Sequence, residues 1–363
     1  MKPHDLESRF AAQQEFLGEA KLVNDSQPLV SVIVTTYQHA RFIAQCLDGI
    51  LMQQTAFPFE VVLGEDESHD GTREICIDYA QKYPDKIRLF LRSRLLSTYV
   101  EDGVTRRLNG AWCRRSARGR YIAMCEGDDY WTSADKLQKQ VSFLEAHPEC
   151  SMCFHNVLVV DDTGKKPPHR AHNLNMRSSY SVVDILPHNF IHTPSVVYRR
   201  DALPPSMPEW FRLMPMGDWP TYLLLGQNGR FGYLQDVMGV YRMHAGGIWS
   251  QMSRAEALEK MILAEEIVLN AHFAKLPSAR HEMATLRRDL VSVHVERGDY
   301  GAADTHARKL LLYTSRRYLG ELRRASGRYL VDMRLLLLAI LRARCSRIWH
   351  VARRFKAYAS PRS

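Results

Sequence analysis

Short apolar runs alternate with amphipathic stretches between residues 30 and 125 of the chain. The run at 30–34 is typical of a buried β-strand, and the stretch after it repeats apolar side chains at helical spacing from Phe42 to Leu51. The pattern then recurs, and it predicts further strands at 59–63, 87–91 and 121–125. Strands that alternate with helices predict a parallel sheet with right-handed crossovers and helices on its two faces.

Polar segments follow three of these strands, at 35–38, 65–70 and 126–129. Ligands of open parallel sheets bind beyond the carboxyl ends of the strands, so we expect the three segments to meet at one crevice. The third segment, Glu126-Gly127-Asp128-Asp129, is acidic. Because Mg²⁺ and Mn²⁺ prefer carboxylate oxygens, it predicts a divalent metal site. An acidic cap of the next helix is the alternative.

The pattern beyond residue 130 predicts a second set of elements. These are a helix at 136–145, a strand at 152–160, a polar loop at 161–179, a strand around 195–198, a helix at 219–225 and a strand at 237–243. From Ser253 onward the periodicity is almost wholly helical. We therefore predict an N-terminal extension over 1–27, an α/β domain over 28–252 and a helical, basic C-terminal region over 253–363.

The composition is that of an ordinary soluble globular protein, with 45% hydrophobic and 25% charged residues. The longest apolar run, 335–341, is far shorter than the roughly 20 residues of a membrane-spanning helix, and the N-terminus lacks the apolar segment of a secretory signal. These features predict a cytoplasmic location. The seven cysteines follow no disulfide-like spacing, and the lone pair Cys150 and Cys153 fits an apolar strand better than a zinc site.

The positive charge is concentrated near the C-terminus, since 301–363 contains 15 Lys or Arg against 3 Asp or Glu while the whole chain carries +9. A basic amphipathic helix from Arg334 to Lys356 predicts either an anionic membrane surface as its partner or packing on the protein with a solvated basic face. The first alternative predicts a peripheral position on the inner face of the cell membrane. No nucleic-acid motif accompanies the charge, so we expect no nucleic-acid partner.

Three segments carry a resemblance to a known family: PLVSVIVTTYQ at 28–38, EVVLGEDESHDGT at 60–72 and RGRYIAMCEGDDYW at 118–131. In this order they resemble the successive nucleotide-binding motifs of family 2 glycosyltransferases, and the resemblance covers roughly residues 28–250. It implies the GT-A fold, which is Rossmann-like with a mostly parallel sheet and helices on both faces, here followed by a helical appendage. It also implies a nucleotide-sugar donor, with a UDP-sugar favoured, and a divalent metal.

The resemblance assigns several residues to the donor. Thr36 and Tyr37 would border the nucleoside, Asp66 would accept a hydrogen bond from the base, and Asn109 would lie near the donor although Asn109-Gly110 by itself reads as a turn. Glu65 stands where many relatives have Asp. Arg118 and Arg120 could meet phosphates, but a basic pair before a strand is more typical of a solvated edge, and we leave both out of the site.

The segment Glu126-Gly127-Asp128 corresponds to the metal-binding motif of the family. Asp128 would bind the metal, and Glu126 would face the ribose or a metal-bound water, with Gly127 between them. Many relatives have Asp where this chain has Glu126. Because Glu is longer, the contact of Glu126 with the ribose is the one that we expect to differ most from the family pattern. The segment 241–250 resembles the mobile stretch that closes over the donor diphosphate, with Arg242 and His244 as phosphate or metal contacts. An edge strand ending in a loop is the alternative.

Asp218 lies in Met216-Gly217-Asp218-Trp219-Pro220, directly before an apolar helical run. A helix N-cap is one interpretation, because Asp is a preferred cap. The resemblance implies another, in which Asp218 is the general base that deprotonates the acceptor hydroxyl. A single displacement would then invert the anomeric carbon.

Taken together, the motifs predict an inverting glycosyltransferase that uses Mg²⁺ or Mn²⁺ and a glycan or lipid-linked acceptor in surface polysaccharide synthesis; a homo-oligomer is compatible with the sequence. The alternative is a non-catalytic nucleotide-sugar-binding or scaffold protein of the same fold. A nucleotidyltransferase or methyltransferase would need a glycine-rich loop after the first strand, and Thr35-Thr36-Tyr37-Gln38 is not one.

Overall fold

The computed structural model describes residues 8–13, 15–16, 27–101, 104–172, 176–186, 189–268 and 277–313. These residues fall into two compact units, one up to Ile185 together with Asn189–Gly247 and the other from Ile248 onward. The basic helix predicted from Arg334 to Lys356 lies outside the described residues, as does most of the extension predicted over 1–27. Among the described helices none is long and apolar enough to cross a bilayer.

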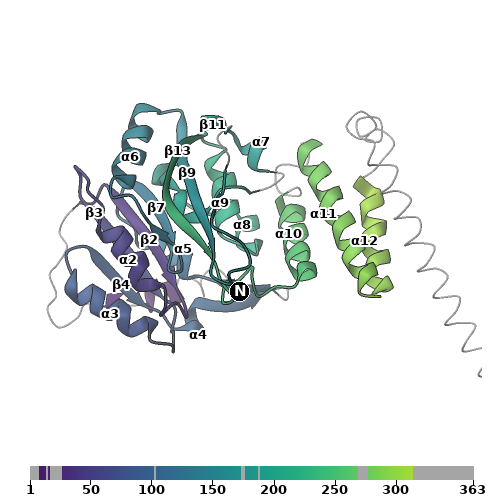
Figure 1. The fold of residues 1–363 in the computed structure, drawn as a ribbon, viewed down its shortest axis with the longest axis horizontal. Helices are drawn as coiled ribbons and strands as arrows, with labels where there is room; N and C mark the ends of the chain where they lie inside the picture. The colour runs from purple at the N-terminus through teal and green to yellow at the C-terminus, as the bar shows by residue number, and fades with distance from the viewer. Residues whose placement is uncertain are drawn as a thin grey trace, which may run out of the picture. The chain divides into compact units, whose positions relative to one another are not determined.

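One large sheet forms the centre of the first unit (Figure 1). Its strands are β1 (Glu15–Phe16), β2 (Val30–Thr36), β3 (Phe59–Glu65), β4 (Ile87–Leu91), β7 (Tyr121–Glu126), β8 (Tyr130–Trp131), β9 (Cys150–Asp161), β10 (His169–Arg170), β11 (Ser179–Tyr180), β12 (Val197–Arg199) and β13 (Arg230–Met243). The main order is β1-β4-β3-β2-β7-β12-β9-β13-β11, with β10 beside β9 and β8 beside β13. Strands β4, β3, β2 and β7 are mutually parallel, as the alternating pattern predicts.

Helices cover both faces of this sheet (Figure 1). They are α2 (Ile43–Leu51), α3 (Thr72–Lys82), α4 (Arg94–Ser97), α5 (Asn109–Ser116), α6 (Lys136–Ala146), α7 (Val182–Ile185), α8 (Glu209–Leu213) and α9 (Asp218–Leu225). Helices α2, α3 and α6 share one core with the sheet, because Leu47, Cys76 and Leu144 pack with Val32 and Ala123. The apolar periodicity of the sequence therefore identified the buried face of α2, where Ile43, Leu47 and Ile50 are fully buried.

Helix α5 packs closely on the opposite face. A Cβ at Gly64 of β3 would lie 2.1 Å from Asn109 Oδ1 and 2.5 Å from Cys113 Sγ, so only glycine permits this approach. The Asn109 side chain is buried and its Nδ2 donates to Gly64 O at 2.8 Å. The turn predicted at Asn109-Gly110 is therefore wrong: this packing starts helix α5 at Asn109 instead.

One strand departs from the parallel direction within the mostly parallel sheet that the resemblance implies, and one other expectation needs correction. Strand β12 runs antiparallel to both neighbours, with Val197 opposite Ala123 of β7 and Cys153 of β9. β12 is three residues long and enters after the 3₁₀ turn Thr193–Ser195, without the helical crossover that a parallel neighbour requires. The loop predicted over 161–179 contains strand β10, which pairs with β9.

Over the residues that the structure describes, the second unit contains α10 (Arg254–Val268), α11 (Pro277–Glu296) and α12 (Tyr300–Tyr313). Leu258 and Ile262 of α10 pack with Leu290 of α11 in a small apolar cluster of their own. The helical appendage predicted from the periodicity is thus present over the part of it that the structure describes.

Candidate active site

The three polar segments that follow β2, β3 and β7 meet at the carboxyl end of the sheet. The backbone N–H of Asp66 donates to Thr36 O at 3.1 Å, and that of Gly127 donates to Thr35 O at 2.9 Å. Because the strands are adjacent and parallel, their ends necessarily lie side by side. The convergence predicted from the sequence is confirmed.

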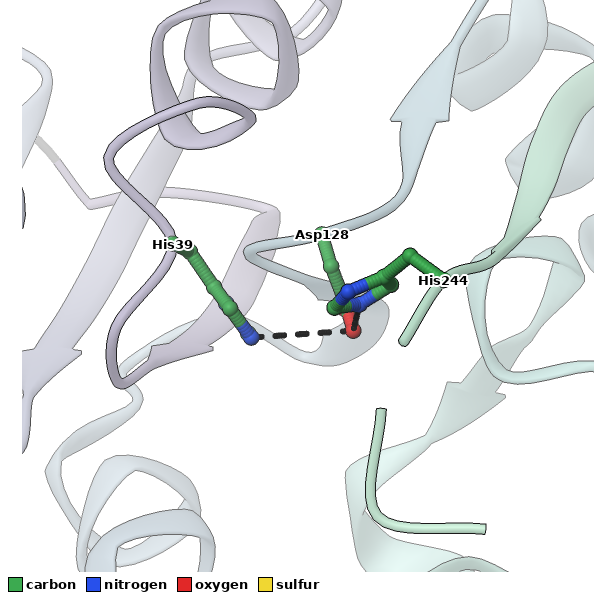
Figure 2. Close-up of side chains that lie close together, drawn as sticks. All are labelled: His39, Asp128 and His244. Carbon is green, nitrogen blue, oxygen red and sulfur yellow. Dashed lines mark hydrogen bonds and ion pairs between the residues drawn. The ribbon is translucent and has the colours of Figure 1, made fainter. Parts of the chain in front are cut away.

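Two histidines and an aspartate gather at this edge (Figure 2). His244 Nε2 lies 3.0 Å from Asp128 Oδ2, and His39 Nε2 lies 3.6 Å from the same oxygen. Asp128 follows β7 and His244 follows β13, so each lies just beyond the end of a strand that the sequence predicts. His39 was missed: it follows β2 without any motif of its own, and only its position three residues after Thr36, at a strand end, could have singled it out.

The protonation states of this cluster suit a cation. Burial lowers the pKa of His39 more than the nearby Asp128 raises it, so the imidazole is neutral at neutral pH. Burial acts to raise the pKa of Asp128, but the hydrogen bond with His244 and the electrostatic interaction with His39 outweigh it and lower the pKa. Two imidazole nitrogens and a carboxylate are ordinary ligands of divalent transition metals, so the residues present fit the metal implied by the sequence.

Gly127 and Thr36 shape the surroundings of the cluster. Thr36 is buried, and its Oγ1 lies 3.3 Å from His39 Nδ1. A Cβ on Gly127 would lie 2.6 Å from Thr36 Oγ1 and 3.0 Å from His39 Nδ1. The glycine of the acidic segment is thus needed for space. The predicted contact of Thr36 with the nucleoside stays a prediction, because the contact described for its hydroxyl is with His39.

Arg242 holds the acidic segment against β13. Its guanidinium donates to Asp128 O at 2.7 Å and to Gln45 Oε1 at 2.6 Å, and its backbone N–H donates to Asp129 Oδ1 at 2.8 Å. The guanidinium also lies over the rings of Phe42 and Tyr130, with its carbon 4.6 and 4.9 Å from the ring centroids. Arg242 therefore has a clear structural role, and its contact with a donor phosphate stays a prediction.

Glu126 and Asp129 lie in the same acidic segment and have raised pKa values. Burial, together with the charges of Asp128 and Asp218, raises the pKa of Glu126 to about 7 despite a hydrogen bond from Thr35 Oγ1. Burial and the neighbouring Asp128 raise the pKa of Asp129, whose Oδ2 accepts no hydrogen bond from any described residue. Because these groups repel one another, the region favours the arrival of a cation.

Asp218 is the first residue of α9, and Asn189 Nδ2 donates to its Oδ2 at 3.1 Å. The N-cap position of α9 is Gly217, and no side chain makes a capping hydrogen bond there. Asp218 therefore lies in the first turn of α9 rather than at its N-cap, with backbone hydrogen bonds to its carboxylate at the start of the helix. Burial raises its pKa, although backbone hydrogen bonds and Asn189 act against the shift. The charge of Asp218 contributes to the raised pKa of Glu126, so Asp218 belongs to the same acidic region.

The residues predicted to bind the nucleoside follow β2 and β3, at the same edge of the sheet as His39, Asp128 and His244. The carbon of the Arg94 guanidinium lies 3.8 Å from the Tyr37 ring centroid, and Arg94 Nη1 lies 2.9 Å from Asp66 Oδ2. Ser97 Oγ donates to the other oxygen, Asp66 Oδ1, at 2.5 Å. Arg94 and Ser97 were missed in the sequence because they follow a different strand, β4. Arg94 thus contacts both Tyr37 and Asp66, and the predicted contacts of these two residues with the nucleoside stay predictions.

Glu65 and Asn109, both named from the resemblance, make hydrogen bonds within the protein. Glu65 accepts from the Ser68 backbone N–H at 2.6 Å and pairs with Arg73 Nε at 2.5 Å, so it fixes the loop after β3. The longer Glu at this position reaches both partners from the strand end. Asn109, as described above, joins α5 to β3, and its oxygen accepts from Arg92 Nε at 3.3 Å. Its predicted proximity to the donor stays a prediction.

Comparison with known sequences places these features in context. Residues 31–204 match the family model described as glycosyl transferase family 2. The uncharacterized protein Rv1520 of Mycobacterium tuberculosis is 39% identical over 224 residues, which are 61% of this chain and 60% of that protein. The minor teichoic acid biosynthesis protein GgaB of Bacillus subtilis is 24% identical over 322 residues, 83% of this chain and 34% of that protein. The chain thus spans about 60% of the length of the mycobacterial relative.

Solved structures show the same architecture. The structure of S. aureus TarS 1–349 in complex with UDP-GlcNAc is similar with a TM-score of 0.57 and 19% sequence identity, over 80% of this chain and 82% of that one. The likeness shows the fold, which is the GT-A fold that the motifs imply.

Proposed function

Because residues 31–204 belong to glycosyl transferase family 2, we propose that this protein transfers a sugar from a nucleotide-sugar donor to an acceptor hydroxyl. The observation that carries the proposal is that Asp128 and His244 meet beyond the ends of the sheet strands, while Asp218 is close enough to Glu126 for its charge to raise the pKa of Glu126. Glycosyl transfer needs a cation beside the departing diphosphate and a base beside the acceptor, and this edge of the sheet offers a residue set for each.

Asp128 and His244 would hold a Mg²⁺ or Mn²⁺ ion. When bound, the ion neutralises charge on the diphosphate leaving group. Arg242 would keep Asp128 in place through its contact with Asp128 O, so that the carboxylate points toward His244. Glu126 would face the ribose or a metal-bound water from the other side of Gly127.

Asp218 would act as the general base. The acceptor oxygen forms a bond to the anomeric carbon while the bond from that carbon to the diphosphate oxygen breaks, and the hydroxyl proton passes to an Asp218 carboxylate oxygen. This single displacement inverts the anomeric carbon. The raised pKa of Asp218 supports the role, because a carboxylate with a higher pKa binds the transferred proton more tightly.

The nucleoside would lie against Tyr37, with Asp66 and Arg94 next to its nucleobase. We favour a UDP-sugar, and the TarS complex makes UDP-GlcNAc the first donor to test. The acceptor would be a glycan or a lipid-linked glycan in surface polysaccharide synthesis, a class for which the name of GgaB gives support. A cytoplasmic enzyme of this kind would meet a lipid-linked acceptor at the inner face of the membrane through its basic C-terminal helix.

The decisive experiment measures donor binding and donor hydrolysis separately. Thermal shift with a panel of UDP- and GDP-sugars identifies the donor, and release of the nucleoside diphosphate is then followed with Mn²⁺, with Mg²⁺ and with EDTA. We expect metal-dependent release that Asp128→Asn removes. Donor binding without release or transfer to any acceptor would favour the non-catalytic binding protein instead.

The membrane position has its own test. Vesicles with anionic lipid should co-sediment the full chain and should bind a chain ending at Ser315 more weakly, because the shorter chain lacks the basic helix. Equal binding of the two chains would contradict the role of that helix.

A further inference from the structure

The proposed function accounts for Asp128 and His244, but the third member of their cluster, His39, has no role in it. His39 follows β2 and comes from the opposite side of Asp128 to His244, which follows β13 (Figure 2). The side chain of His39 is 16% exposed and that of His244 7%, so both rings are held largely within the protein. Because His39 is largely shielded from water, contact with solvent does not explain why a polar imidazole lies beside Asp128.

The distances fit a shared ion. Two ligands that lie about 2.1 Å from one metal and subtend a right angle are about 3.0 Å apart, and wider angles give larger separations. His244 Nε2 and His39 Nε2 lie 3.0 and 3.6 Å from Asp128 Oδ2, and one ligand atom of each residue lies within 4.8 Å of the others. These separations allow all three atoms to bind one ion.

A second observation concerns the other nitrogen of the ring. Histidines that bind metals usually donate their second ring N–H to a neighbouring oxygen, which fixes the ring and leaves the ligating nitrogen free of a proton. His39 Nδ1 lies 3.3 Å from Thr36 Oγ1, a buried hydroxyl at the end of β2. Gly127 leaves the space for this pair, because any Cβ there would lie 3.0 Å from Nδ1. The ring is thus oriented with Nε2 toward Asp128.

We propose that His39 is a third protein ligand of the metal, which makes the site a two-histidine, one-carboxylate site. Such a site binds Mn²⁺ and Co²⁺, which accept imidazole nitrogen as well as carboxylate oxygen, more tightly than Mg²⁺. Mg²⁺ favours oxygen ligands and keeps its water, whereas imidazole suits the later divalent ions. A site with three protein ligands also binds its ion before the donor arrives. The inference rests on the proposed function, since it concerns the same site.

The test measures metal binding by the full-length protein without nucleotide. Calorimetric titration gives the Kd for Mn²⁺ and Mg²⁺, and pulsed electron paramagnetic resonance of bound Mn²⁺ counts the coupled histidine nitrogens. All proteins carry His294→Gln, because Glu259, His294 and His306 form a second group of potential ligands in the helical unit. His39→Gln replaces the nitrogen by a neutral oxygen of similar reach, and His39→Ala removes the ligand.

We expect coupling from two histidines in the parent protein and from one in each His39 variant. His39→Ala should weaken Mn²⁺ binding by at least ~10-fold, and His39→Gln should reduce the preference for Mn²⁺ over Mg²⁺. His69→Ala is the matched control, since His69 is an exposed histidine in the neighbouring loop, and it should change neither Kd nor coupling. Thermal midpoints confirm that each variant is folded.

Two outcomes separate the inference from the function beneath it. If His39→Ala leaves the Mn²⁺ Kd within twofold and the coupling unchanged while Asp128→Ala and His244→Ala abolish binding, His39 is not a ligand and the proposed function stands. If all three variants bind Mn²⁺ like the parent, the metal site itself is wrong, and with it both the inference and the metal step of the proposed function.

Discussion

The two ends of the parallel strands bury carboxylates under opposite electrostatic conditions. At the amino end, Glu60 of β3 is fully buried and accepts hydrogen bonds from Ser31 Oγ at 2.6 Å and Arg118 Nε at 2.8 Å, with Arg88 Nη1 3.2 Å away. Burial acts to raise its pKa, but these partners outweigh burial and lower it. At the carboxyl end, Glu126 and Asp218 have raised pKa values.

The difference separates structural from functional acids. Glu60 has two guanidinium groups of the protein itself beside it, so its charge is balanced whether or not a ligand is present. The carboxylates at the other end repel one another, and their stabilisation depends on a cation from outside. A buried acid with a fixed cationic partner holds the fold, whereas a cluster of buried acids with raised pKa values marks a site. Arg118, left out of the site from its sequence, belongs to the structural end.

The sharpest test of this contrast is Asp218→Asn. Loss of the base should reduce transfer by about 10²- to 10⁴-fold while Mn²⁺ and donor binding stay unchanged. The matched control is Asp184→Asn, which changes the first-turn aspartate of α7 and should leave transfer unaffected. Kinetics with the identified donor and acceptor measure both. Loss of donor binding in Asp218→Asn would remove Asp218 from the role of base.

The same variant should gain stability over the parent protein as pH rises. The raised pKa of Asp218 means that the unfolded chain releases this proton at lower pH than the folded protein does, so folding loses stability as pH rises above the usual 3.8. Asn carries no charge and avoids the penalty. Urea unfolding without metal at pH 5 and pH 8 should therefore show a larger gain for Asp218→Asn at pH 8 than at pH 5.

Glu60→Gln should do the opposite at the other end of the strands. It removes the carboxylate that Arg88 and Arg118 share and leaves Arg88 with Glu15 as its remaining acidic partner. We expect a loss of about 3 kcal/mol in the free energy of unfolding with normal transfer below the melting temperature. Because the pKa of Glu60 is lowered, its stabilisation is present above pH 4.5 and disappears as pH falls through the lower folded-state pKa. Urea unfolding from pH 7 to pH 3 checks this. A loss of activity without a loss of stability would overturn the division between the two ends.

Asp128→Asn should weaken metal-dependent donor binding by about 100-fold, since the amide is a poorer ligand than the carboxylate. Titration of UDP with and without Mn²⁺ measures the change. Unchanged affinity in Mn²⁺ would refute the metal role of Asp128.

Gly127→Ala should have the smallest effect. The added Cβ meets Thr36 Oγ1 at 2.6 Å, so the strand end must shift, and we expect a loss of about 1 to 2 kcal/mol in stability and weaker Mn²⁺ binding. Gly217→Ala, where a Cβ meets nothing within 4 Å, is the control. Equal Mn²⁺ affinity in both variants would show that the space at Gly127 does not matter for the metal.

Most of the architecture followed from periodicity. The apolar runs predicted β2, β3, β4, β7, β9 and β13, and the helical spacing predicted α2, α3, α6 and α9. The sequence missed the antiparallel direction of β12 and the start of α5 at Asn109, because both depend on what packs against the segment rather than on its own pattern.

The sequence by itself determined which residues lie at the carboxyl ends of the strands, since strand ends follow from local apolar runs. It therefore identified Asp128, and the family motifs added His244 and Asp218. Only the tertiary structure brought His39 to Asp128, gave Arg242 and Glu65 internal partners and set the pKa values of the buried acids. The reason is physical: periodicity records the burial of each segment, whereas contacts between side chains depend on how loops and segments pack. This holds for Glu65 and Arg73, 8 residues apart, as well as for Asp128 and Arg242, 114 residues apart.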